Sequence, residues 1–160
     1  MIFTREDLEA IQSGQNYALM NDINLASSEW TPIGWDSSLS NIVPYSGQFE
    51  GNGYKIQNLY INDQTKNRLG LFAMISQASI TNLELSNFNI TGNDYIGMLA
   101  GEIKDNPMLT VENITLSGFI DGDQFAGSLI GRVNNSVISA SFIHVDSNLT
   151  LQTQSGGLIG

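Results

Sequence analysis

The amino-acid sequence predicts an all-β fold. Three observations support this: two short patterns that repeat along the chain, hydrophobic residues that alternate within each repeat, and a composition poor in charge. Charged residues make up 14% of the 160 residues, whereas about 25% is typical of soluble domains. The hydrophobic fraction of 41% is high enough for a packed core, so disorder is not predicted. Asn, Ser, Thr and Gly must then cover the surface, which favours strands and turns over helices.

The first pattern reads glycine, any residue, apolar residue, any residue, then a small or apolar residue. It occupies residues 47–51, 70–74, 97–101, 127–131 and 156–160. The second pattern reads apolar, any, Asn, apolar, any, apolar, and follows the first in each unit. It occupies residues 56–61, 80–85 and 111–116, and residues 137–142 keep its alternation without the Asn. Two independent patterns in a constant order indicate a repeat protein.

The length of the repeat selects the architecture. The units alternate with a period of two, which predicts strands, and a helical repeat would need an apolar stripe every 3.6 residues. A propeller blade needs about 40 residues, more than these units contain. The sequence therefore predicts a right-handed parallel β-helix of about four to five coils, with each strand about 4.8 Å from the strand of the next coil.

Stacking of such coils places equivalent residues above one another. Three apolar ladders are expected inside the coils, and an amide ladder in which each side chain bonds the next. The apolar ladders are expected to contain Phe49, Phe72, Leu99, Leu129 and Leu158 or Ile159; Leu59, Leu83, Ile114 and Ala140; and Ile61, Leu85, Leu116 and Phe142. The amide ladder is expected to contain Asn58, Asn82 and Asn113.

The first 45 residues depart from the repeat. Thr4 is a helix N-cap residue with acidic residues after it, and Gly14 provides a stop, so a short capping helix is predicted near residues 4–13. Residues 1–45 are thus interpreted as the cap and first coil, and residues 46–160 as repeats of the same single domain. Because Gly160 stands inside a repeat, the chain is expected to be a fragment of a longer protein.

Three segments in order, Asn21–Leu25, Trp30–Gly34 and Phe49–Leu59, resemble the N-terminal region of bacterial GLUG-motif proteins, and the glycine-containing units resemble the GLUG repeats. Two features depart from that family: Glu50 stands where the family usually has Asp, and the unit at residues 126–155 matches the repeat pattern poorly. The resemblance implies a right-handed β-helix in a large secreted or cell-surface bacterial protein, often adhesin-like and sometimes attached to a protease. It implies no catalytic residues within the repeats.

Composition restricts the partners. Sixteen acidic and six basic residues give a net charge of −10, which disfavours binding to nucleic acid. Short apolar runs predict no membrane insertion, and the absence of cysteine removes disulfides and thiolate metal sites. No cofactor is expected. The expected partners are further repeats or domains of the same polypeptide, and a host or cell-surface protein or glycan.

The preferred function is a non-catalytic structural or adhesive module of a surface or secreted protein, with no catalytic, cofactor-binding or metal-binding residue. The alternative is a carbohydrate-binding or carbohydrate-active β-helix, which as a lyase or hydrolase needs paired carboxylates. Asp121 and Asp123 are the close acidic pair within a repeat, and they flank Gly122 in a predicted turn. They are interpreted as turn residues.

Other candidate residues receive structural interpretations. His144 and Asp146 share one face of a predicted strand, where His144 is expected to be packed or to face solvent. Lys66, Arg68 and Lys104 are expected to offset nearby acids. The aromatic residues Trp30, Trp35, Tyr45 and Tyr54 are expected to pack at the junction with the cap. The glycosylation triplets at Asn89, Asn113 and Asn148 fall in predicted strands and are attributed to chance.

A third hypothesis is a module stabilised by calcium, because acidic residues lie in or near the predicted turns: Asp63, Asp94, Asp105, Asp121, Asp123 and Asp146. Calcium needs six to eight oxygen ligands that converge on one point. Aligned on the repeat glycines, these acids do not form one column. We therefore expect solvated turn carboxylates and no requirement for metal.

Overall fold

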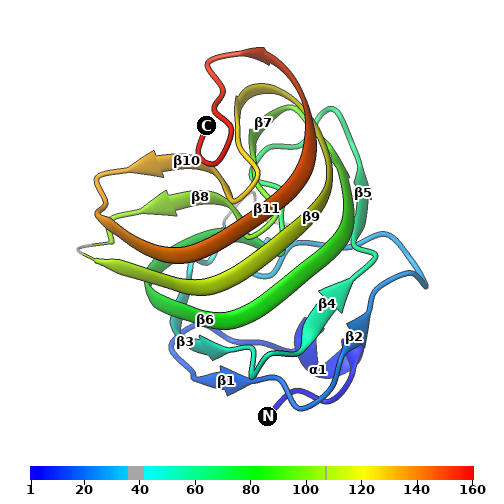
Figure 1. Cartoon of the computed structure of the whole chain (residues 1–160), viewed down its shortest axis with the longest axis vertical. Coiled ribbons are helices and arrows are strands. Elements are labelled where there is room, and N and C mark those ends of the chain that lie inside the picture. The colour runs from blue at the N-terminus through cyan, green and yellow to red at the C-terminus, as the bar shows by residue number, and fades with distance from the viewer. Residues whose placement is uncertain (36–41, 107) are drawn as a thin grey trace.

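A computed structural model describes residues 1–35, 42–106 and 108–160. It has one helix, α1 (Arg5–Glu9), and the strands β1 (Tyr17–Ala18), β2 (Ile23–Asn24), β3 (Tyr45–Glu50), β4 (Lys55–Gln57), β5 (Tyr60–Asn62), β6 (Phe72–Thr91), β7 (Asp94–Ile96), β8 (Ala100–Lys104), β9 (Leu109–Ala126), β10 (Ile130–Asn134) and β11 (Ile138–Thr153). The strand-to-strand pairings are parallel, and the strands wind into a β-solenoid of about four turns (Figure 1). The predicted fold class is confirmed.

The short helix covers the first coil, as predicted. The Thr4 side chain accepts a hydrogen bond from the backbone N–H of Asp7, and the Asp7 side chain accepts one from the backbone N–H of Thr4. This capping box satisfies two amide groups at the start of the helix. Leu8 is fully buried against the first coil, and the helix ends at Glu9, earlier than the predicted residue 13.

The core lies inside the coils and consists of columns of stacked apolar side chains. One column contains Ile23, Ile56, Leu85, Leu116 and Val145. A second contains Ile61, Ile90, Ile120 and Leu149, and a third contains Leu83, Ile114 and Ile143. Each inward side chain in the lower coils is covered by the next coil, so these columns are almost fully buried up to β9.

The predicted ladders are correct in part. Leu83 pairs with Ile114 and Leu85 with Leu116, and the Asn113 side chain donates to that of Asn82 over 2.9 Å, as expected. Backbone hydrogen bonds also align Leu99 with Leu129, and Leu129 with Leu158.

Phe49 does not lie under Phe72, so this part of the first ladder is wrong. Phe49 pairs with Ile80, whereas Phe72 pairs with Ile33 below and Ala100 above. The glycine pattern at 47–51 belongs to a different strand of the coil than the pattern at 70–74. The two rings still meet inside the core, edge to face, with centroids 5.8 Å apart.

Four further ladder members are also misplaced. Ile61 pairs with Ile90 and not with Leu85, and Ala140 pairs with Val111 and not with Ile114. The Leu59 carbonyl accepts a hydrogen bond from the Asn89 N–H, six residues beyond its expected partner Leu83 on the same strand, β6. Phe142 is 79% exposed. These errors have two causes. Each coil has two Asn-containing corners, and residues 56–61 pass through the second while residues 80–85 pass through the first. In the last coil, residues 140–145 and not 137–142 match residues 111–116, because Phe142 stands in the place of the Asn.

The second corner forms its own amide ladder, to which Asn58 belongs. The Asn58 side chain donates to Asn24 over 2.9 Å and accepts from Asn87 over 2.6 Å. Asn58 and Asn87 have φ of 62° and 54°, and Asn82 and Asn113 at the first corner have φ of 54° and 55°. Asn tolerates this left-handed conformation better than most residues, which explains why it occurs at both corners.

Candidate functional site

Asp121 and Asp123 lie within β9 and not in a turn, so the predicted turn is wrong. Both side chains are half-buried, and they line a hollow of about 190 Å³ with Gln64, Gly92 and Asn93. Gly122 between them faces inward, where a Cβ atom would meet Ala126 and Ile96. The glycine thus marks tight packing inside the coil. As residues i and i+2 of one strand, the two aspartates share its outer face, and their Cα atoms are about 7 Å apart.

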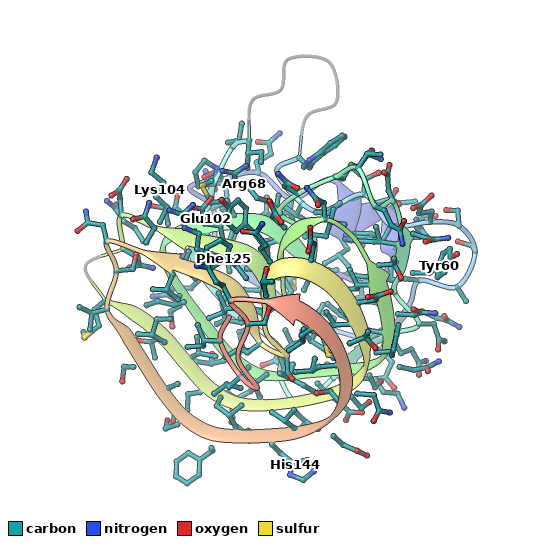
Figure 2. All side chains as sticks on the ribbon, turned by 90° about the horizontal axis from the view of Figure 1, so that it is seen from above. Tyr60, Arg68, Glu102, Lys104, Phe125 and His144 are labelled. Atoms are coloured by element: carbon teal, nitrogen blue, oxygen red, sulfur yellow. The ribbon has the colours of Figure 1, made fainter. Side chains whose placement is uncertain are left out.

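His144 and Asp146 lie on β11, paired with Thr115 and Ser117 of the coil below. Both are exposed, and Figure 2 shows the His144 side chain directed away from the ribbon. The prediction that His144 packs or faces solvent is confirmed. An imidazole in this position has water on its open side and no buried acid against it, which suits a surface residue.

The aspartates proposed as calcium ligands are dispersed. Lys66 lies 2.9 Å from Asp63, and hydrogen bonds from Thr65 and Lys66 lower the pKa of Asp63 to about 2. Asp105 accepts a hydrogen bond from Asn135, and one carboxylate oxygen of Asp94 is buried without a hydrogen-bond partner. Among the residues that the structure describes, no three His, Asp or Glu side chains are grouped as metal ligands would be.

The aromatic residues near the cap divide into two groups. Trp30 and Tyr45 are almost fully buried: the Trp30 indole donates to the carbonyl of Leu71, and Tyr45 stacks on Phe72 at 4.8 Å. Burial raises the pKa of Tyr45, whose hydroxyl donates to main-chain carbonyls. Packing is therefore confirmed for these two residues. Trp35 is half-buried under the Lys66 ammonium, and Tyr54 is 37% exposed.

Sequence reasoning missed a buried carboxylate, Glu102 on β8, which is 2% exposed. The Arg68 Nε donates to its Oε2 over 2.6 Å, and Arg132 Nη1 lies 3.9 Å from its Oε1. Beside it, the Tyr95 and Phe125 rings have centroids 5.4 Å apart. Both guanidinium groups lie over Tyr95, at 5.1 and 5.0 Å. Figure 2 shows Arg68, Glu102 and Phe125 together on one side of the coil, near Lys104.

This Arg–aromatic cluster holds a corner of the coils against β8 and β10. Two guanidinium groups flank this buried carboxylate, so its charge is paired on both oxygens. The prediction that Arg68 and Lys66 offset acids is confirmed, while Lys104 forms no ion pair within the described residues. Glu102 could have been found by aligning residues 101–103 with 131–133 at the 30-residue spacing, which places Arg132 above it.

The outer surface of β5, β6, β9 and β11 carries exposed side chains in register. Tyr60 pairs with Asn89, Asn89 with Phe119, and Phe119 with Asn148. Tyr60 is 44% and Phe119 37% exposed, and Figure 2 shows Tyr60 at the periphery of the coils, directed outward. The triplet residues Asn89, Asn113 and Asn148 lie in strands, as predicted.

The chain is similar to parts of several much longer proteins. It is 32% identical over 81% of its length to halomucin of Haloquadratum walsbyi, an archaeal protein of which it covers 2%. It is 31% identical over 71% of its length to an immunoglobulin A1 protease of Streptococcus sanguinis, of which it covers 6%. It is 29% identical over 64% of its length to a putative Gly-rich membrane protein of Evansella cellulosilytica, of which it covers 12%.

No family model and no solved structure matches the chain. The relatives show that this type of sequence occurs as a small part of large cell-surface or secreted proteins, one of which is named as a membrane protein. Their sources include an archaeon, so the similarity is not restricted to bacteria. Within the described residues, no helix is long and apolar enough to cross a membrane.

Proposed function

We propose that the chain is a non-catalytic structural or adhesive module of a large cell-surface or secreted protein. The observation that carries this proposal is the stacking of nearly the whole described chain into one continuous ladder of coils. Architecture of this kind builds length and surface in place of a closed pocket. The Glu102 carboxylate, buried between two guanidinium groups, is consistent with a structural role.

The relatives support the proposed location. Immunoglobulin A1 is an antibody, so a protease named for it works where antibodies are present, outside the bacterial cell. A second relative is named as a membrane protein. The chain covers 2–12% of these three proteins, which is the proportion expected of one segment among many. The segments Asn21–Leu25, Trp30–Gly34 and Phe49–Leu59 further support repeats of the GLUG type.

The proposed partners include further coils of the same polypeptide. The upper face of the last coil carries apolar side chains at inward positions that are only half-buried, among them Ile143, Leu149 and Leu151. Val145, in the same column as Leu116, is 38% exposed. Another coil stacked on β11 would bury these side chains and pair its backbone groups.

A carbohydrate-active enzyme is the second candidate, and one observation favours it. Asp121 and Asp123 share a face of β9 and line a hollow of about 190 Å³, and a glycosidase needs two carboxylates beside the bond that it cleaves.

The test is an assay of the purified chain against a panel of polysaccharides and against immunoglobulin A1. We expect no release of reducing ends and no cleavage of the antibody. Turnover that Asp121→Asn abolishes, and that Glu112→Gln at an exposed position of the same strand leaves intact, would establish the enzyme and overturn the module. In a separate experiment, the melting temperature of the chain is measured with calcium and with a chelator, and neither is expected to change it.

A further inference from the structure

Four side chains form a straight row on the outside of the solenoid. They are Tyr60 on β5, Asn89 on β6, Phe119 on β9 and Asn148 on β11, and the parallel register stacks them in this order. All four are exposed. Because successive coils lie about 4.8 Å apart, the two aromatic rings are separated by about 10 Å with an amide between them. We refer to these residues as the aromatic–amide row.

The exposed rings are not side effects of an uncovered end. Phe119 has β6 below it and β11 above it, and Tyr60 has β6 above it and a backbone hydrogen bond from Trp30 below it, unlike Val145 or Phe142 on the last coil. Their neighbours along each strand, Leu59 with Ile61 and Ile120 after Phe119, are the residues that fill the core. Two exposed rings in one column, with amides beside them, offer a ligand both stacking surfaces and hydrogen-bonding groups.

A groove of about 410 Å³ runs beside the row. Its lining includes Asn87, Phe88, Asn89, Ser117, Phe119, Asp146 and Asn148. Tyr60 lies one coil below Asn89, outside this lining, so the row extends beyond the groove. Gly118, which has φ of 151°, contributes no side chain and leaves the groove open at its centre. The groove and the Tyr60 ring below it together offer an extended chain a path across several coils.

We propose that the aromatic–amide row binds a neutral polysaccharide. The apolar face of a sugar ring stacks on Tyr60 and on Phe119, while the Asn89 and Asn148 amides, which both donate and accept, bond ring hydroxyls. The two rings of the row are about 10 Å apart, which lets one extended glycan chain stack a different sugar ring on each of them. This inference deepens the proposed module by giving its adhesive role a ligand class.

The charge around the row selects a neutral ligand. Asp146 lies in the groove, no basic side chain is among the groove-lining residues, and the whole chain carries −10. Uronate-rich glycans, sulfated glycans and nucleic acids are therefore repelled. A protein partner would require a contiguous apolar centre, whereas here an amide separates the two rings.

Affinity electrophoresis tests the proposal with the purified chain in gels that contain either a neutral glucan, xylan or mannan, or an anionic polygalacturonate. We expect retardation in at least one neutral gel and none in the anionic gel. Tyr60→Ala and Phe119→Ala should each weaken binding about tenfold, equivalent to about 1.4 kcal/mol. Tyr60→Phe keeps the ring and should retain binding.

Tyr54→Ala is the matched control, because Tyr54 is also 37% exposed but lies outside the row. Melting temperatures of all variants show whether each is folded, and Tyr60→Phe reports on the ring if Tyr60→Ala unfolds. Absence of retardation in every neutral gel, retardation in the anionic gel alone, or equal loss with Tyr54→Ala would overturn the proposal. None of these results contradicts the proposal of a non-catalytic module, which would be overturned only by turnover in the separate enzymatic assay.

Discussion

The coil that contains β9 and the coil that contains β11 have the same path but differ in burial. Ile114 and Leu116 on β9 are fully buried, whereas the residues stacked above them, Ile143 and Val145 on β11, are half-buried and 38% exposed. At the corner, Asn113 donates to Asn82, while Phe142 in the equivalent position is 79% exposed. In a β-solenoid, a coil thus derives much of its burial from the coil above it.

The last coil also differs from the coil below it in the residue that occupies the first corner. Phe142 has a φ of 54°, a conformation that costs a bulky residue about 1–2 kcal/mol. Asn113, with φ of 55°, adopts it at lower cost and gains an amide hydrogen bond. The last coil therefore keeps the backbone of the repeat after losing the side chain that suits it.

The largest expected effect comes from removing one side chain at two levels of the same column. Ile114→Ala should lower the free energy of unfolding by about 3–4 kcal/mol, because it leaves a cavity between two coils. Ile143→Ala should cost about 1 kcal/mol, since solvent already reaches that side chain. Urea denaturation of both variants measures the difference. Equal losses would mean that β11 is as well covered as β9.

The middle of the Asn corner should be the next most sensitive position. Asn82 donates to Glu50 and accepts from Asn113, so Asn82→Ala removes both bonds and strains φ, for a loss of about 2–3 kcal/mol. Asn82→Gly removes the bonds without the strain and should cost about 1 kcal/mol less. Thermal unfolding followed by circular dichroism compares the two. If Gly is no better than Ala, the left-handed conformation at this corner is not the source of strain.

Restoring the corner in the last coil should stabilise the protein. Phe142→Asn relieves the strained φ and places an amide above Asn113, for a gain of about 1 kcal/mol. Phe142→Gly serves as the control that relieves strain alone. The melting temperature should rise in the order wild type, then Gly, then Asn. A lower melting temperature for Asn than for Phe would show that the Phe142 ring contributes packing.

At the lower end of the same corner, Glu50 should make the free energy of unfolding depend slightly on pH. Burial raises the pKa of Glu50, but hydrogen bonds from Thr81, the Asn52 amide and Asn82 outweigh it and hold the pKa below its usual value of 4.5. A lowered pKa in the folded state gives stability that is complete above pH 4.5 and is lost as the pH falls through the folded pKa. Glu50→Gln should flatten this acid limb of a stability–pH curve. If Glu50→Gln leaves the acid limb unchanged, the Glu50 carboxylate does not contribute to the stability of this corner.

The sequence predicted the architecture well because the repeat is a property of composition and spacing. The glycine units and the alternation around Leu83–Leu85 and Ile114–Leu116 specify coils, and their register in the structure is as expected. Ala140 was misplaced by three residues along the correct strand, because Phe142 replaces the Asn that marks the corner. Phe49 and Leu59 were misplaced because a coil contains several similar strands, and a five- or six-residue pattern does not say which one it occupies. Pairing between distant strands, not local pattern, decides that question.

The candidate sites were less accessible to sequence reasoning. The Arg–aromatic cluster unites Arg68, Tyr95, Glu102 and Arg132 from different coils, and no short motif joins them. The aromatic–amide row is hidden for the same reason, since Tyr60 and Phe119 are neighbours only across Asn89 of the intervening coil. Both become readable once the register is known, because each column then follows by counting along the strands.

The register of the coils is the central claim, and a cross-link measures it directly. The chain contains no cysteine, so Ser79→Cys with Thr110→Cys introduces a single pair at positions that the structure places opposite each other, about 5 Å apart. That separation permits a disulfide, whereas Ser79→Cys with Glu112→Cys lies about 8 Å apart and does not. We predict rapid oxidation of the first pair and a gain in stability of about 3–4 kcal/mol, with little oxidation of the second. Preferential cross-linking of the second pair, or failure of the first to cross-link, would contradict the stacking on which every column and both surface sites depend.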